Sequence, residues 1–165
     1  MLDTSGPDHA GRLVGWDTNQ EQLHKIIYLA KPTITDTSFL NDLVIDNKHG
    51  VIYIADTAQG SQAAIIIVNL KTGEARRVLQ DSQYTTAEDI DIVINGRTMN
   101  LGGQPARLGV NPITLDPNED WLYFGSMSGT SVYRIATSAI NNKSLSTKAL
   151  EAKVIRYGTK PISDG

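Results

Sequence analysis

The sequence predicts an all-β protein of the β-propeller class. The main evidence is a repeated hairpin, because residues 41–54 and 111–124 each hold a short apolar strand, a four-residue polar turn and a second apolar strand. Corresponding positions lie 70 residues apart, as Asn41 and Asn111 do. One such hairpin cannot bury its own apolar face, so a repeat at a fixed spacing is typical of propellers and other stacked arrays.

A second repeat extends the pattern, since residues 67–74 match residues 14–21 at a spacing of 53. We therefore expect about three blades. They divide the chain into the end of one blade (1–35), a complete blade (36–81), an insertion (82–108), a further blade (109–162) and the start of the next (163–165). About three blades are fewer than a closed propeller contains, so we expect the chain to be an internal fragment of a longer protein. The alternative is a homo-oligomer in which copies pair through their open blade edges.

Local patterns predict further elements within this frame. Residues 12–17 and 23–29 have the composition of strands. In the insertion, an apolar alternation ends at Asn95-Gly96, a strong hairpin signal, and predicts a small extra hairpin over one face of the ring. Residues 144–154 predict a short helix that leads into an outer strand near residues 154–157.

Composition excludes several classes of protein. The net charge of −3 provides no basic patch for nucleic acid. The longest apolar run, residues 63–68, has the length of a strand, so no membrane span is predicted. The chain has no cysteine, which excludes disulfides, thiol catalysis and cysteine-type zinc sites. Residues 1–8 lack the features of a signal peptide; a secreted or periplasmic parent protein is left open.

A candidate site follows from the repeat. Asn41, Asn111 and Ser163-Asp164 occupy the same place, the start of an innermost strand, in three successive units. In a propeller such positions converge on the central channel, and amide and carboxylate oxygens suit a hard cation such as Ca²⁺. The structural alternative is that these residues cap turns and satisfy backbone donors. For Asp46 and Asp116 we expect the turn role.

Other potential motifs are weak. His9, His24 and His49 are scattered and have no histidine or cysteine partner at zinc-ligand spacing. Gly102-Gly103 is not followed by the residues of a phosphate-binding loop. The acidic residues Glu88, Asp89 and Asp91 are expected to form a solvated face rather than a cation site. Arg97 and Arg107 are expected to form surface salt bridges rather than to bind an anionic ligand at the channel mouth.

The chain resembles the major royal jelly protein/Yellow family along nearly its whole length. The segments that carry the resemblance are residues 2–4, 38–46, 53–57 and 109–117. The resemblance implies a six-bladed propeller, related more distantly to calcium-dependent lactonases of the gluconolactonase/regucalcin (SMP-30) type. The loop at residues 7–11 lacks the cysteines of the insect proteins and is similar to the bacterial, uncharacterised members.

The resemblance also implies roles for the candidate residues. By similarity to the lactonases, Asn111 and Asp164 would be metal ligands, and Asn41 and Asp42 would contact substrate. The metal would polarise a lactone or ester carbonyl while Asp42 or Asp164 activates water. A further ligand, a glutamate from the first blade, would precede Met1.

Two other functions stay open beside this metal-dependent hydrolase. One is a non-catalytic propeller with a small-molecule ligand in its channel, as some insect relatives bind biogenic amines. That function requires an aromatic or acidic pocket and no metal. The other is that this polypeptide, if incomplete, has no independent activity.

Overall fold

The computed structural model describes residues 11–162 of the 165-residue chain. These residues form antiparallel sheets with few helical turns, so the predicted all-β class is confirmed. One four-stranded sheet contains β3 (Leu40–Asp46), β4 (Val51–Asp56), β5 (Ala64–Asn69) and β6 (Ala75–Val78). The other contains β11 (Val110–Leu115), β12 (Trp121–Ser126), β13 (Ser131–Ala136) and β14 (Ile155–Thr159). In both, spatial order follows chain order, which is the arrangement of a propeller blade.

The remaining elements are short. The predicted strands near the N-terminus are confirmed as the hairpin β1 (Gly11–Asp17) and β2 (Gln22–Leu29). Helical turns are η1 (Gly60–Gln62), α1 (Thr137–Ile140) and α2 (Thr147–Glu151). The predicted short helix before an outer strand is confirmed by α2 and β14, whereas α1 was not predicted. Within residues 11–162, no helix has the length and apolar character needed to cross a membrane.

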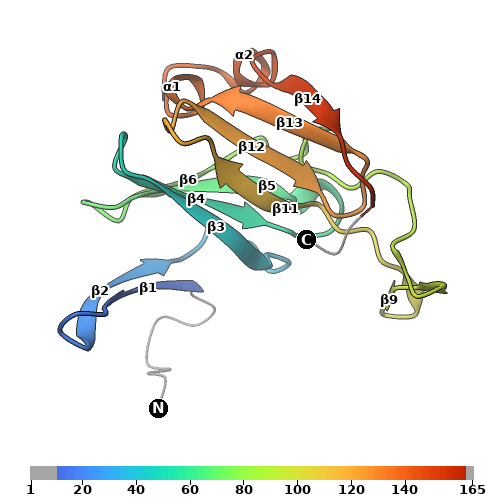
Figure 1. The fold of residues 1–165 in the computed structure, drawn as a ribbon, viewed down its shortest axis with the longest axis horizontal. Coiled ribbons are helices and arrows are strands. Elements are labelled where there is room, and N and C mark those ends of the chain that lie inside the picture. The colour runs from blue at the N-terminus through green and yellow to red at the C-terminus, as the bar shows by residue number, and fades with distance from the viewer. Residues whose placement is uncertain (1–10, 163–165) are drawn as a thin grey trace.

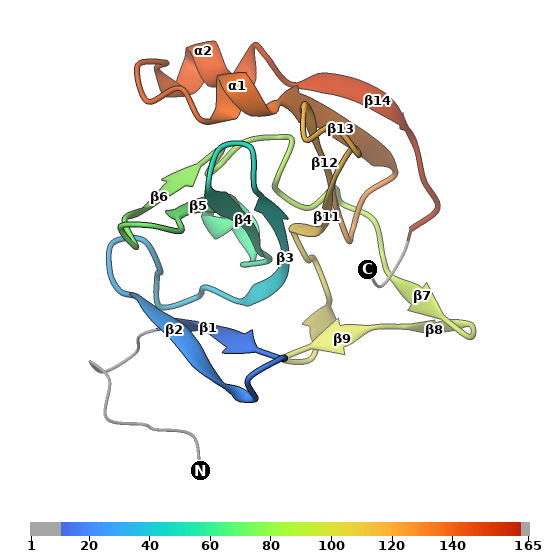
Figure 2. The ribbon, with the colours of Figure 1, turned by 60° about the vertical axis from the view of Figure 1, so that its left-hand side comes forward.

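The sheets stack as layers around the central sheet (Figures 1 and 2). The β1–β2 hairpin packs on one face of the β3–β6 sheet, where Ile52 and Ile54 of β4 join a cluster with Ile27 and Leu29. The β11–β14 sheet packs on the other face, through a second and larger cluster. Because both faces are covered, every residue of β4 is buried. This is why β4 reads as a continuous apolar run rather than an alternation.

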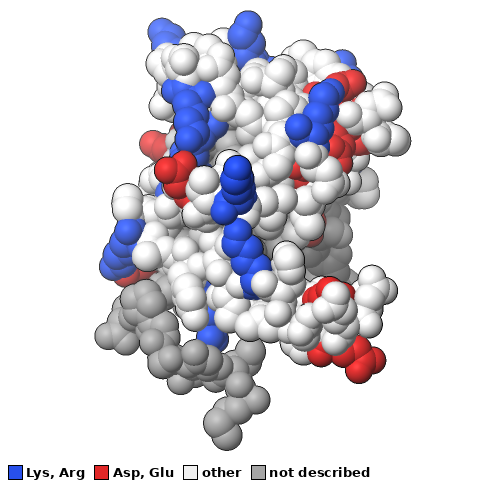
Figure 3. Space-filling view, turned by 90° about the vertical axis from the view of Figure 1, so that its left-hand side faces the viewer, with Lys and Arg blue, Asp and Glu red and all other residues white. Residues whose placement is uncertain are grey.

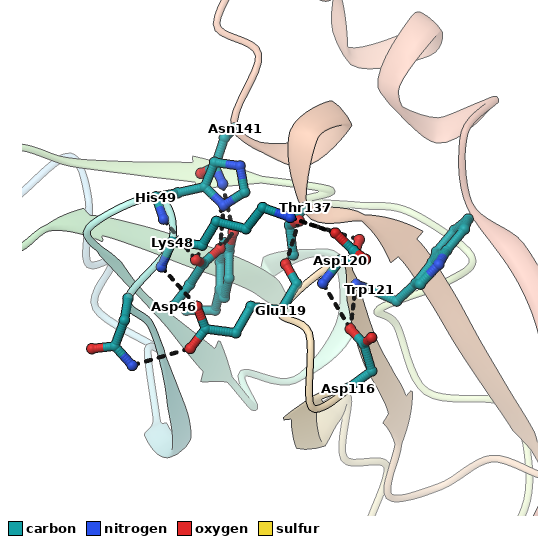
Figure 4. A network of polar contacts seen from close by, with 11 residues as sticks. Asp46, Lys48, His49, Asp116, Glu119, Asp120, Trp121, Thr137 and Asn141 are labelled. Atoms are coloured by element: carbon teal, nitrogen blue, oxygen red, sulfur yellow. Dashed lines mark hydrogen bonds and ion pairs between the residues drawn. The ribbon is translucent and has the colours of Figure 1, made fainter.

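The two repeated turns contact each other (Figure 4). The Glu119 carboxylate accepts hydrogen bonds from the Lys48 backbone N–H (2.7 Å) and from Asn47 Nδ2 (3.0 Å). Lys48 Nζ also pairs with Asp120 (2.5 Å). The β3–β4 turn is therefore attached to the equivalent β11–β12 turn of the next sheet.

Both repeated aspartates are turn residues, as expected. Asp116 Oδ1 accepts from the backbone N–H groups of Asp120 (2.8 Å) and Trp121 (2.7 Å). Asp46 Oδ1 accepts from the His49 N–H (2.8 Å). Asp46, however, is fully buried, and its Oδ2 also accepts from the Tyr53 hydroxyl (2.7 Å). Burial and then this hydrogen bond raise the pKa of Tyr53 far above its ordinary value.

A second buried aspartate fixes the segment that leads into β3. Asp56 Oδ2 accepts from Arg77 Nη1 (2.6 Å) and from the Ser38 hydroxyl (2.6 Å), and its Oδ1 accepts from the Phe39 N–H (2.7 Å). Arg77 also donates to the carbonyl of Thr33 (2.9 Å). One ion pair thus joins the outer strand β6, the end of β4 and the preceding loop.

The insertion forms two small hairpins. The predicted turn at Asn95-Gly96 is confirmed between β7 (Val93–Ile94) and β8 (Arg97–Thr98), with positive φ at both turn residues. A second hairpin, β9 (Asn100–Leu101) and β10 (Gln104–Pro105), was not predicted. Its turn is Gly102-Gly103, with φ of 60° and 83°, which explains the glycine pair. Arg107 bridges Asp89 (2.8 Å) and Asp91 (2.7 Å), as the surface salt-bridge interpretation expected.

The substitution Arg77→Met should lower the free energy of unfolding by about 3–5 kcal/mol, because it leaves the Asp56 carboxylate buried without its cation. Urea denaturation measures this loss. The matched control is Arg107→Met, since Arg107 pairs with an aspartate whose side chain is 97% exposed. Its expected loss is below about 1 kcal/mol. Equal losses in the two variants would contradict a structural role for the Arg77–Asp56 pair.

The stability of the protein should also depend on Tyr53 at alkaline pH. Above about pH 10, where an ordinary tyrosine ionises, the unfolded chain releases this proton while the folded chain retains it. A raised folded-state pKa therefore contributes stability that is present below about pH 10 and is lost as the pH rises. Denaturation between neutral and alkaline pH should show a shallower decline for Tyr53→Phe than for the wild type. An identical slope would mean that Tyr53 ionises equally easily in both states.

Candidate functional site

The innermost strands of the two sheets, β3 and β11, contact each other and bring three of the four predicted residues into one region (Figure 2). Asn41 and Asp42 lie near the start of β3, and Asn111 lies near the start of β11. In each strand the pairing register shifts there, between Leu40 and Leu43 and between Val110 and Ile113. A bulge redirects side chains away from regular alternation, so the repeated asparagines mark a repeated irregularity.

Asp42 connects the two inner strands. Its Oδ2 accepts a hydrogen bond from the Ile113 N–H of β11 (3.2 Å), and its Oδ1 accepts from the Leu43 N–H (2.9 Å). The residue is nevertheless exposed. Each carboxylate oxygen has a second lone pair, so Asp42 retains capacity to contact a ligand while it holds β3 to β11.

The two asparagines differ in exposure. Asn41 is exposed, whereas Asn111 is only 5% exposed. Asn111 Oδ1 lies 3.5 Å from the Thr57 hydroxyl, which donates to the carbonyl of Val110 (2.8 Å). Thr57 follows β4, so the Asn111 side chain faces the neighbouring sheet as well as the inner strands. This contact is compatible with the structural interpretation of a repeated asparagine.

The predicted metal site is only partly within the described residues. Asp164 lies outside them, as does Ser163, so the pairing of Asn111 with Asp164 stays a prediction. In the part of the chain that the structure describes, no group of three His, Cys, Asp or Glu side chains could hold a metal ion. Among the described residues, the predicted oxygen donors are therefore one carboxylate, Asp42, and two amides, Asn41 and Asn111.

A pocket of about 210 Å³ lies beside Asp42. Residues of β11, β12 and β13 line it, among them Tyr123 and Phe124, together with Lys160 after β14. Lys160 Nζ donates to the carbonyl of Gly129 (2.8 Å), and burial lowers the pKa of this amine. The pocket thus combines an exposed carboxylate with the partly exposed Tyr123 and a lysine whose charge is disfavoured by burial.

The aromatic side chains continue along the sheet beyond the pocket. Tyr123 lies edge-on to Tyr157, with 4.9 Å between ring centroids, and is the cross-strand partner of Arg134. The Arg134 guanidinium lies 4.2 Å from the ring centroid of Trp121 and 5.2 Å from that of Tyr157. The rings of Trp121 and Tyr157 therefore already contact a cation of the protein, the Arg134 guanidinium.

Sequence reasoning did not identify Tyr123 or Lys160 as site residues. A usable signal existed for Tyr123, because it is the repeat counterpart of Tyr53. Tyr53 is fully buried, while Tyr123 is partly exposed in the pocket. Equivalent tyrosines therefore have different surroundings in the two sheets, and the repeat alone does not separate them.

A larger and more apolar hollow of about 570 Å³ lies where the insertion meets the central sheet. Phe39, Met99 and Leu101 contribute to its lining, and Thr57 lies at its polar side. It contains no ionisable side chain among its lining residues. It therefore offers apolar contact near Asn111 but no charged group for recognition.

Comparison with known proteins identifies the family. No curated protein is similar enough to match the chain. The profile described as "Major royal jelly protein" matches residues 6–163, which is nearly the whole chain and agrees with the resemblance carried by the repeated segments. This is a family of propellers, so the two four-stranded sheets are successive blades, joined through their inner strands and turns. The chain belongs to the major royal jelly protein family.

Proposed function

We propose that this protein binds a small organic cation, such as a primary amine, without catalysis, in the pocket beside Asp42. The observation that carries the proposal is an exposed carboxylate next to the partly exposed Tyr123 in a cavity of about 210 Å³. A carboxylate neutralises an ammonium group, and an aromatic face attracts a cation within about 6 Å. Membership of the family supports a small-ligand site in a propeller.

The polar contacts of the pocket support binding of a cation over binding of an anion. Asp42 is the carboxylate in its lining, and the ammonium of Lys160, which also lies in the lining, donates to the carbonyl of Gly129 (2.8 Å). The side chains that surround the pocket are therefore suited to an ammonium with an apolar or aromatic body.

Calcium-dependent hydrolysis of a lactone or ester is the second candidate. Its support is that Asp42 and Asn111 lie at equivalent bulges on neighbouring inner strands. In this proposal Asn111 and Asp164 bind the metal, Asn41 and Asp42 contact the substrate, and Asp42 or Asp164 activates water. Two observations favour simple binding instead: both Asp42 oxygens accept backbone hydrogen bonds, and Asn111 is nearly buried.

Phenethylamine is a suitable probe, and isothermal titration calorimetry measures its binding. Asp42→Asn should weaken its affinity by about tenfold, or roughly 1.4 kcal/mol, because the ammonium loses its charged partner. The matched control is Asp89→Asn, which removes the same charge from an exposed position in the insertion and should leave affinity unchanged. Equal affinity in the wild type and in Asp42→Asn would contradict the proposal.

The same protein distinguishes the metal-dependent alternative. A ligand that binds only the folded state raises the midpoint of thermal unfolding. If Ca²⁺ raises it, and if Asn111→Ala removes that effect while Asp89→Asn does not, the hydrolase hypothesis replaces amine binding. We expect no stabilisation by Ca²⁺ beyond that of an equal ionic strength of NaCl.

A further inference from the structure

A cavity of about 240 Å³ lies between the central sheet and the segment that follows α1. It is separate from the pocket beside Asp42, and none of the predicted site residues lines it. The polar and charged side chains of its lining that carry the argument come from three places in the chain. They are His49 of the β3–β4 turn, Glu74 and Arg76 at β6, and Asn141 and Lys143 after α1.

His49 is held in one orientation by Asp46 (Figure 4). Its Nδ1 lies 2.8 Å from Asp46 Oδ2, and the same carboxylate accepts the His49 backbone N–H and the Tyr53 hydroxyl. Because a carboxylate accepts hydrogen bonds, Nδ1 carries a proton in this contact. The other ring nitrogen, Nε2, is then a second donor whenever the imidazole is protonated.

Arg76 brings a partly buried positive charge to the cavity. Its Nη2 donates to the carbonyl of Ile140 (2.6 Å), and burial lowers the pKa of the guanidinium. Among residues 11–162, no Asp or Glu forms an ion pair with Arg76, whereas the adjacent Arg77 pairs with Asp56. A guanidinium has five N–H donors, so several of them are left for a ligand.

Asn141 and Lys143 close the other side of the cavity. Asn141 Nδ2 donates to the Tyr53 hydroxyl (2.6 Å), which places the segment after α1 against the Asp46–His49 contact. Lys143 Nζ lies 3.7 Å from Glu74, and both side chains are largely exposed, at 74% and 72%. Figure 3 shows the side of the molecule where the β3–β4 turn lies: basic side chains are spread over its top, sides and middle, and acidic ones lie beside several of them.

We propose that this cavity is a binding site for a small oxyanion, the carboxylate or phosphate group of a metabolite. Arg76 supplies a planar fork of donors that matches two oxygens of such a group. Lys143 adds a charge at the mouth, and protonated His49 adds a donor from the opposite wall. The bound anion supplies the negative charge that Arg76 lacks among the described residues, and a partly dry site strengthens that attraction.

Sulfate and acetate are the probes, since one is tetrahedral and the other planar. Each is titrated calorimetrically into the full chain, with NaCl at equal ionic strength as reference. Either anion should bind, and the tighter one identifies the preferred geometry. Arg76→Gln should weaken binding by at least about tenfold, because charge-assisted donors are lost. Arg97→Gln, an exposed charge in the insertion, should leave binding unchanged.

Two exposed substitutions keep the test decisive if Arg76→Gln does not fold. Lys143→Gln should weaken binding by roughly threefold, and Glu74→Gln should strengthen it by a similar factor, because one removes an attractive and the other a repulsive charge. Sulfate also stabilises proteins by exclusion from their surface, an effect that does not depend on a binding site. The comparison among the variants therefore carries the test. Equal responses in all variants, or no heat of binding above that with NaCl, would overturn the proposal.

A comparison at two pH values tests the part of His49. The charged and titratable groups around it are Asp46, Tyr53, Glu74, Arg76 and Lys143. Sulfate keeps its charge between about pH 5.5 and pH 8.5, the interval that brackets histidine titration. Wild-type affinity for sulfate should be higher at the lower pH, and His49→Gln should remove most of that difference. A pH dependence that persists in His49→Gln would exclude His49 as a donor to the anion.

Discussion

The structure depends on one constraint: β4 has apolar side chains on both faces and must be covered on both. The β1–β2 hairpin covers one face and the β11–β14 sheet covers the other. No single four-stranded unit can meet this requirement alone, which is the physical reason for the repeat. Stacking the sheets in this way also sets β3 beside β11 and the β3–β4 turn beside the β11–β12 turn. The pocket beside Asp42 lies at the β3–β11 junction, whereas the cavity beside His49 lies between the central sheet and the segment after α1.

Buried charge distinguishes the two sides of the central blade. Asp56 meets a guanidinium, and this pair fixes the loop before β3. Asp46 instead meets a hydroxyl and an imidazole, which orients His49 toward a cavity that also receives Arg76. Neighbouring arginines of β6 thus have different surroundings. Within residues 11–162, Arg77 has a carboxylate partner, whereas the one hydrogen-bond acceptor of Arg76 is a backbone carbonyl. The ion pair of Arg77 holds the loop before β3 in place, whereas the guanidinium of Arg76 keeps donors for a bound anion.

Local patterns predicted the strands, the Asn95-Gly96 turn and the turn aspartates, because each depends on residues close in sequence. Asn41, Asp42 and Asn111 could be assigned to inner strands for the same reason. Their exposure to solvent could not be predicted, because it depends on how the sheets pack. His49 was judged only against other histidines and cysteines, so its partner Asp46, three residues earlier, was overlooked. The environment of Arg76 could not be predicted, because a missing carboxylate partner is a property of the packed blades. Gly102-Gly103 was tested against a phosphate loop and not against a second hairpin.

We expect the two four-stranded sheets to unfold as one cooperative unit, because they share a core. Native-state hydrogen exchange of Leu122→Ala tests it, since Leu122 of β12 is fully buried in the cluster that contains Tyr53 and Ala55 of β4. The cavity should cost about 2–5 kcal/mol. If the sheets are one unit, the amides of β4 should lose protection by the same free energy as the amides of β12. A loss confined to β11–β14, with β4 unchanged, would show that the sheets fold independently.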